Sequence, residues 1–233
     1  MSHLSRRQLI HYGGGFLGTG LAATILGSNF VKPQEASAYS QTKQDLTPDE
    51  AIQRLTEGNK RFVAFKQENP NQDQIRLTEV ADGQTPFAAI LSCADSRVPT
   101  ELVFDQGLGD LFVCRIAGNI ATPQQIGSLE FGTMVLGARA LMVIGHSRCG
   151  AVDAALKGGD FPGEIDTLVS TVQEGTAGVE PGENQLEAGI RANVMHQVKI
   201  LNQSPVLTEL IDKAKLKIVG AYYNLDDGTI SIL

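Results

Sequence analysis

Short apolar runs that alternate with helical segments constrain the fold of this chain more than any other feature of its sequence. The runs occupy residues 87–92, 111–116, 141–145 and 216–223. Continuous apolar character over such lengths is typical of strands that are buried on both faces of a sheet. Strands that alternate with helices form parallel sheets covered by those helices. We therefore predict an α/β domain with a central, mostly parallel β-sheet flanked by helices.

The segments between and after these runs predict helices and a last strand. Thr122 and Pro123 open a helix that we expect to continue through Leu136, and residues 150–156 predict another. Residues 158–182 are rich in Gly, Asp and Glu, so we expect loops there and one helix at most. Asp-Asp-Gly at residues 226–228 predicts a tight turn, after which residues 229–233 fold back as an antiparallel edge strand.

A helical arm is predicted ahead of the first strand, over about residues 47–68. Residues 47–50 read Thr-Pro-Asp-Glu, in which the threonine suits the N-cap, the proline the first helical position and the glutamate a capping box. The apolar spacing continues to Phe62 and Phe65 and predicts one buried face. We expect that face to pack on the domain or on a partner subunit.

The first part of the chain has the pattern of an export signal. Paired arginines, Arg6 and Arg7, precede a weakly apolar, Gly-rich run at residues 13–30, and residues 36–38 read Ala-Ser-Ala. This order resembles a secretory signal of the twin-arginine type. We expect residues 1–38 to be a signal peptide that is removed, and residues 39–233 to form one domain. The product would be exported, to the periplasm or to a thylakoid lumen. The apolar run is marginal for a stable membrane span, and an uncleaved anchor is the alternative.

The composition excludes some classes of partner and cross-link. The chain of 233 residues has a formal net charge of −7, whereas a nucleic-acid surface needs a clustered excess of Lys and Arg. The three cysteines, Cys93, Cys114 and Cys149, are an odd and sparse set, unlike a disulfide framework. We expect no nucleic-acid partner, and metal binding or buried thiols are the better interpretations of the cysteines.

Reactive side chains follow two of the predicted strands. Residues 93–97 read Cys-Ala-Asp-Ser-Arg directly after the first run, and residues 146–150 read His-Ser-Arg-Cys-Gly directly after the third. In open α/β sheets, functional groups gather just beyond the carboxyl ends of the strands. If the two strands are neighbours, Cys93, His146 and Cys149 converge, and two thiolates with one imidazole suit tetrahedral zinc. Three protein ligands leave the fourth position open, which is typical of a catalytic zinc.

Asp95 and Arg97 give this site two arrangements. Asp95 is placed to be a further zinc ligand, and Arg97 is placed to hold the same carboxylate away from the metal in a bidentate pair. Without a metal, Cys93 and Cys149 would be core thiols or a disulfide, and Asp95 and Arg97 an ordinary structural ion pair. Cys114 lies inside its own predicted strand and is interpreted as a core thiol.

The two motifs together resemble those of the β-class carbonic anhydrases. Cys-Ala-Asp-Ser-Arg is followed about fifty residues later by His-x-x-Cys-Gly, and the segments between and after them match the family pattern. These segments are Ala-Gly-Asn at 117–119, Ser-Leu-Glu-Phe at 128–131 and Lys-Ile-Val-Gly-Ala-Tyr-Tyr at 217–223. The similarity spans roughly residues 46–233. Either zinc motif alone is weak, whereas the pair is specific.

The resemblance implies a lyase, carbonate dehydratase, that interconverts carbon dioxide and bicarbonate in carbon utilisation. It assigns one Zn²⁺ per subunit to Cys93, His146 and Cys149, and makes Asp95 and Arg97 the catalytic dyad. Zinc-bound hydroxide would attack the carbon of carbon dioxide while Asp95 accepts its hydrogen bond.

Three more residues are candidates for substrate binding, and one position indicates the subtype. Gln84 matches a substrate-binding glutamine of plant-like members, while the Gly150 N–H and an apolar wall that includes Phe112 would complete a small pocket. Many bacterial members carry a Trp three residues before the first zinc cysteine, where this chain has Ile90 and no Trp anywhere. The resemblance is therefore to the plant-like, open type, in which Asp95 stays on Arg97.

Two other functions remain compatible with the same scaffold. One is hydrolysis of carbon disulfide or carbonyl sulfide, since these are linear and apolar like carbon dioxide. The other is a catalytically silent module that binds zinc or bicarbonate, although the intact Asp95 and Arg97 argue against it. The resemblance also implies a homodimer or a higher homo-oligomer, in which Gln84 reaches a neighbour's site.

Overall fold

The computed structural model describes residues 46–233. The predicted signal peptide, residues 1–38, lies outside these described residues. Within them, no helix combines the length and the apolar character that crossing a membrane requires.

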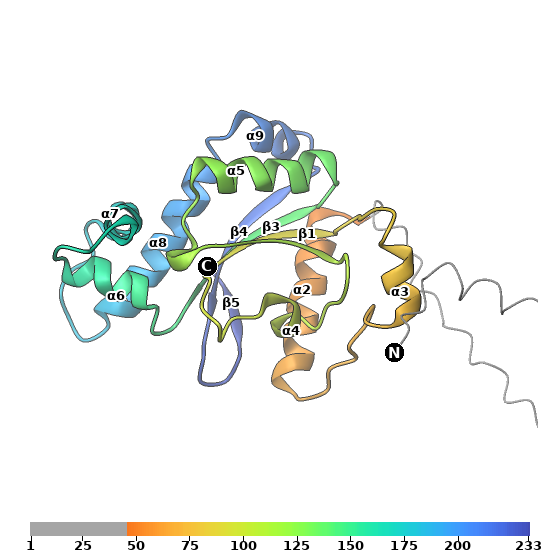
Figure 1. The fold of residues 1–233 in the computed structure, drawn as a ribbon, viewed down its shortest axis with the longest axis horizontal. Coiled ribbons are helices and arrows are strands. Elements are labelled where there is room, and N and C mark those ends of the chain that lie inside the picture. Colours follow the sequence, from red (N-terminus) through yellow and green to blue (C-terminus); the bar gives the residue numbers. More distant parts are fainter. Residues whose placement is uncertain (1–45) are drawn as a thin grey trace, which may run out of the picture. The chain divides into compact units, whose positions relative to one another are not determined.

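A single five-stranded sheet forms the centre of the described chain, with strand order β2-β1-β3-β4-β5 (Figure 1). The first four strands run parallel, and the last pairs antiparallel with β4. Their bounds are Ala88–Ser92 (β1), Leu111–Arg115 (β2), Ala140–His146 (β3), Lys217–Tyr223 (β4) and Ile230–Ile232 (β5). The predicted fold class is thus confirmed, and each strand lies within about one residue of its predicted run.

Helices cover both faces of the sheet. The α-helices are α2 (Pro48–Val63), α3 (Gln74–Glu79), α4 (Thr100–Val103), α5 (Pro123–Glu130), α6 (Gly150–Lys157), α7 (Glu164–Thr176), α8 (Gln185–Leu201) and α9 (Pro205–Asp212). The sequence did not predict α3, α4 or α9. The helix expected through Leu136 changes at Phe131 into a π-helical turn, Phe131–Val135.

Alternate side chains of the buried strands enter two separate cores, as the period of two in a strand requires. Ala88 and Ile90 of β1 pack with α2 and α4, whereas Ala89 and Leu91 pack with α5, α8 and α9. Figure 1 shows α5 and α9 on one side of the sheet and α2 and α4 on the other. A third cluster, beyond the carboxyl ends of the strands, joins Cys93 and Cys149 to α6 and α7.

The helical arm begins as predicted but ends early. Thr47 caps α2 and forms the full capping box with Glu50. The helix stops at Val63, and Phe65 has a φ of 54° and is 89% exposed. The predicted extension to residue 68, with Phe65 on the buried face, is therefore wrong. The left-handed backbone at Phe65 turns the chain out of the helix and away from the core.

Candidate metal centre

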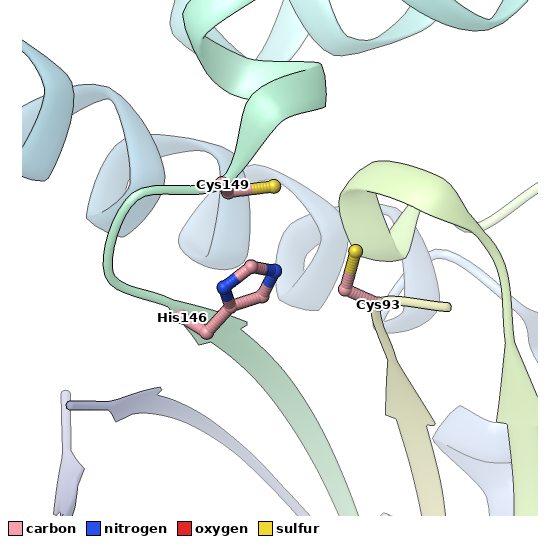
Figure 2. Close-up of side chains that lie close together, drawn as sticks. All are labelled: Cys93, His146 and Cys149. Atoms are coloured by element: carbon pink, nitrogen blue, oxygen red, sulfur yellow. The ribbon is translucent and has the colours of Figure 1, made fainter. Parts of the chain in front are cut away.

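The pairing of β1 with β3 brings the two sequence motifs together. Ser92, the last residue of β1, pairs with Ile144 of β3, so Cys93 leaves the sheet beside the end of β3 at His146. Cys149 is the N-cap of α6, three residues further on. The ligand atoms of Cys93, His146 and Cys149 all lie within 4.8 Å of one another, and all three residues are buried. Figure 2 shows both sulfurs and a His146 ring nitrogen directed into the same space.

The His146 ring is oriented as a metal ligand. Its Nδ1 lies 3.0 Å from the carbonyl oxygen of Ser147, which can only accept a hydrogen bond. In the neutral ring, Nδ1 therefore carries the proton and Nε2 presents its lone pair. Nε2 is buried and has no hydrogen-bond partner among residues 46–233. A buried polar atom without a partner is costly, and a cation at this point would satisfy it.

The two thiols lie within 4.8 Å of each other, so the charge on one affects the pKa of the other. A hydrogen bond from the Cys149 thiol, aided by the backbone N–H groups of Gly118 and Asp95, holds the pKa of Cys93 well below its usual range. The same hydrogen bond with Cys93, together with burial, raises the pKa of Cys149. One thiolate thus forms readily and opposes the second. A divalent cation removes this opposition because metal ligation requires both sulfurs as thiolates. The donor set fits zinc, which binds Cys sulfur and His nitrogen in tetrahedral sites.

Asp95 lies beside this cluster and is held by Arg97. The Arg97 Nε and Nη2 donate to the two carboxylate oxygens at 2.9 and 2.8 Å, and the Arg97 backbone N–H donates to Oδ1 at 2.9 Å. These hydrogen bonds hold the pKa of Asp95 well below its usual range. Oδ2 remains 3.7 Å from Nε2 of His146. Of the two arrangements expected for Asp95, the structure shows the one in which the carboxylate pairs with Arg97.

Arg115, which was not predicted from the sequence, supports the loop from Cys93 to Asp95. It is the last residue of β2, and its Nε and Nη2 donate to the carbonyl oxygens of Cys93 and Asp95 at 3.1 and 2.5 Å. Its position at the carboxyl end of a predicted strand was the available signal. The strand order that places β2 beside β1 was not evident from the sequence.

The other predicted site residues are placed differently. Gly150 is the first residue of α6, next to Cys149. Gln84 is exposed and precedes the first residue of β1, whereas Cys93 directly follows the last residue of that strand. Phe112 pairs with Ala89 near the start of β1 and has its ring centroid 6.4 Å from that of Phe131, and it packs against a different core from the one that holds Cys93 and Cys149. Within one chain, neither Gln84 nor Phe112 is brought to the metal centre.

Cys149→Ser is expected to abolish stable zinc binding, because it removes one of three ligands. The wild-type chain should carry about one zinc ion. Cys114→Ser is the matched control, since burial raises the pKa of Cys114 and the thiol lies outside the cluster. Metal analysis by mass spectrometry checks both variants. A Cys149→Ser protein that keeps full zinc would contradict the assignment.

Comparisons with known proteins agree with this geometry. The family model described as carbonic anhydrase matches residues 88–230. Carbonic anhydrase 2 of Mycobacterium tuberculosis is 40% identical over 190 residues, 79% of this chain and 92% of that protein. The chloroplastic β-carbonic anhydrase 5 of Arabidopsis thaliana is 31% identical over 226 residues, 91% of this chain and 73% of that protein.

A solved structure extends the similarity to the fold. The β-carbonic anhydrase of Coccomyxa, in complex with acetazolamide, superposes with a TM-score of 0.63 at 26% identity. The match covers 67% of this chain and 75% of that one. Because the family model spans most of the chain and includes both halves of the metal centre, this protein belongs to the β-carbonic anhydrase family.

Proposed function

We propose that this protein is a zinc-dependent carbonic anhydrase that catalyses the reversible hydration of carbon dioxide to bicarbonate and a proton. One observation carries the proposal: a buried Cys93–His146–Cys149 cluster lies beside a carboxylate that Arg97 keeps off the cluster. Three protein ligands, with the Asp95 carboxylate held by Arg97, leave the fourth coordination position open for the reaction. A structural zinc site, in contrast, is closed by four protein ligands.

The position of each side chain in the metal centre determines its role in the proposed reaction. Zinc, when bound, supplies Lewis acidity that lowers the pKa of water to about 7, which makes a nucleophile available near neutral pH. Cys93, His146 and Cys149 hold the metal, and the Ser147 carbonyl fixes the His146 ring. Asp95, kept ionised by Arg97, accepts a hydrogen bond from the attacking oxygen and orients its lone pair toward the substrate. An oxygen–carbon bond forms, one carbon–oxygen π pair moves onto oxygen, and the released proton passes to buffer.

Asp95→Asn is expected to lower the rate of carbon dioxide hydration by roughly 10²–10⁴-fold, because the amide cannot act as the same ionised acceptor. Zinc content should stay unchanged. Asp226→Asn is the matched control, since Asp226 also pairs with an arginine, Arg148, at 2.9 Å but is exposed and is not part of the ligand cluster. Stopped-flow hydration with zinc analysis on the same samples provides the measurement.

The wild-type result separates the alternatives. Rapid hydration that Asp95→Asn removes and Asp226→Asn leaves intact supports the carbonic anhydrase. A zinc-loaded wild type that hydrolyses carbon disulfide or carbonyl sulfide but does not hydrate carbon dioxide would reassign the substrate. A zinc-loaded protein inactive toward all three would be a silent binding module, and the proposal would be wrong.

We also propose that the chain is exported. The support is the sequence pattern of paired arginines, a Gly-rich apolar run and Ala-Ser-Ala at residues 36–38. Expression in a bacterium with a twin-arginine export system should yield a periplasmic product that begins near residue 39, as measured by intact-mass spectrometry of the fractions. Uncleaved protein confined to the cytoplasm would exclude both the signal and the proposed domain boundary at 38/39.

We further propose a homo-oligomer. β2 pairs only with β1 among the described strands, and the adjacent π-helical turn exposes Phe131, Met134 and Val135 by 49%, 42% and 64%. An exposed strand edge beside apolar side chains favours association. Val135→Glu should shift the sedimentation coefficient toward that of a monomer, whereas the distant Ile165→Glu, also an exposed apolar residue, should not. A wild type that sediments as a monomer would refute this proposal.

A further inference from the structure

Two side-chain amides are fully buried on α8, outside the metal centre. Asn193 and Gln197 lie one turn apart, and both have 0% exposure. A buried amide costs free energy unless its groups are hydrogen-bonded, so its partners indicate what it holds in place. Both of these amides contact the chain that follows β2.

The two amides form a chain of hydrogen bonds that ends on one loop. Asn193 Nδ2 donates to the carbonyl oxygen of Gly118 at 2.8 Å. Gln197 Nε2 donates to Asn193 Oδ1 at 3.0 Å, and Gln197 Oε1 accepts from the backbone N–H of Ala121 at 2.9 Å. The amide pair therefore anchors both ends of the segment 118–121. That segment includes part of the 3₁₀ turn Ala117–Asn119.

This loop is also in contact with the metal centre. Ile120 of this loop lies in the same buried cluster as Cys93 and Cys149, and the Gly118 backbone N–H helps to hold the pKa of Cys93 below its usual range. Gly118 has a φ of 73°, and a Cβ there would lie 2.7 Å from Cγ2 of Val172 on α7. A glycine in the left-handed region is therefore required for this residue to pack closely against α7 while its C=O accepts from Asn193.

We propose that Asn193 and Gln197 are positioning residues that hold the Gly118 N–H on the Cys93 sulfur and thereby set the affinity and donor strength of the zinc site. This inference rests on the proposed zinc site and concerns the hydrogen bonds that position the neighbouring loop, residues 118–121. An N–H that donates to a thiolate withdraws charge from the sulfur and fixes its orientation, as outer partners do for other metal ligands. Within residues 46–233, neither amide forms a hydrogen bond with a metal ligand, so each acts through the loop.

Glycine at position 175 offers a way to move the amide without replacing it. Gly175 lies on α7, and a Cβ there would be 2.3 Å from Asn193 Oδ1. Gly175→Ala should therefore displace Asn193 and reproduce the effect of its removal. Gly127→Ala is the matched helical control, because nothing lies within 4 Å of its added Cβ.

The test measures zinc dissociation constants by chelator competition and the absorption spectrum of the cobalt-substituted protein. Asn193→Ala should weaken zinc binding by roughly 10–100-fold. It should also move the sulfur-to-cobalt charge-transfer band to longer wavelength, because the sulfur loses a hydrogen bond. Gln197→Met keeps the side-chain volume and should show the same changes to a smaller extent, so the test does not depend on the folding of Asn193→Ala.

Asn202→Ala is the control at the C-cap of the same helix, since Asn202 Nδ2 donates to the local Val198 carbonyl at 2.9 Å. It should match wild type in both readouts. Folded Asn193→Ala and Gln197→Met proteins with wild-type affinity and an unshifted band would overturn the inference while leaving the proposed enzyme intact. A wild type that binds neither metal would overturn the enzyme proposal and the inference together.

Discussion

The parallel pairing of β1 with β3 is the constraint on which the rest of the site depends. Its register sets Ser92 against Ile144, so the first cysteine and the histidine leave the sheet side by side. A shift of one residue would turn every side chain of the strand to the other face. It would also move the metal ligands apart and would exchange the β1 side chains that enter the two cores. Because both faces are packed with buried apolar side chains, the packing that stabilises the sheet also specifies the metal centre.

The folded chain places two cysteine sulfurs close together in a buried site, where negative charge on both is unfavourable. Two buried sulfurs lie close together, and a thiolate on Cys93 opposes a second one on Cys149. Backbone N–H groups offset part of this cost, because those of Gly118 and Asp95 lower the pKa of Cys93 and those of Ala151 and Val152, at the start of α6, oppose the rise in the pKa of Cys149. Arg97 neutralises the neighbouring carboxylate. A divalent cation would supply the remaining positive charge, and the convergence of Cys93, His146 and Cys149 suits such an ion.

The sequence was sufficient for the strands and the zinc ligands because these depend on local patterns. Buried parallel strands are continuous apolar runs, and the ligand motifs follow directly after two of them. The end of α2 was mispredicted because the left-handed turn at Phe65 has no local apolar signal. Arg115, Asn193 and Gln197 were missed for a different reason. Each acts on backbone from another element, so its role appears only when strand order and helix docking are known.

X-ray absorption at the zinc edge of the purified protein tests the proposed ligand set, because it reports the atoms around the metal. We expect two sulfurs at ~2.3 Å, one imidazole nitrogen at ~2.0–2.1 Å and one further light atom in the open position. That result would place Cys93, His146 and Cys149 on the metal together, as the register of β1 and β3 requires. A shell with one sulfur or none, or with four protein sulfur and nitrogen ligands and no open position, would contradict it.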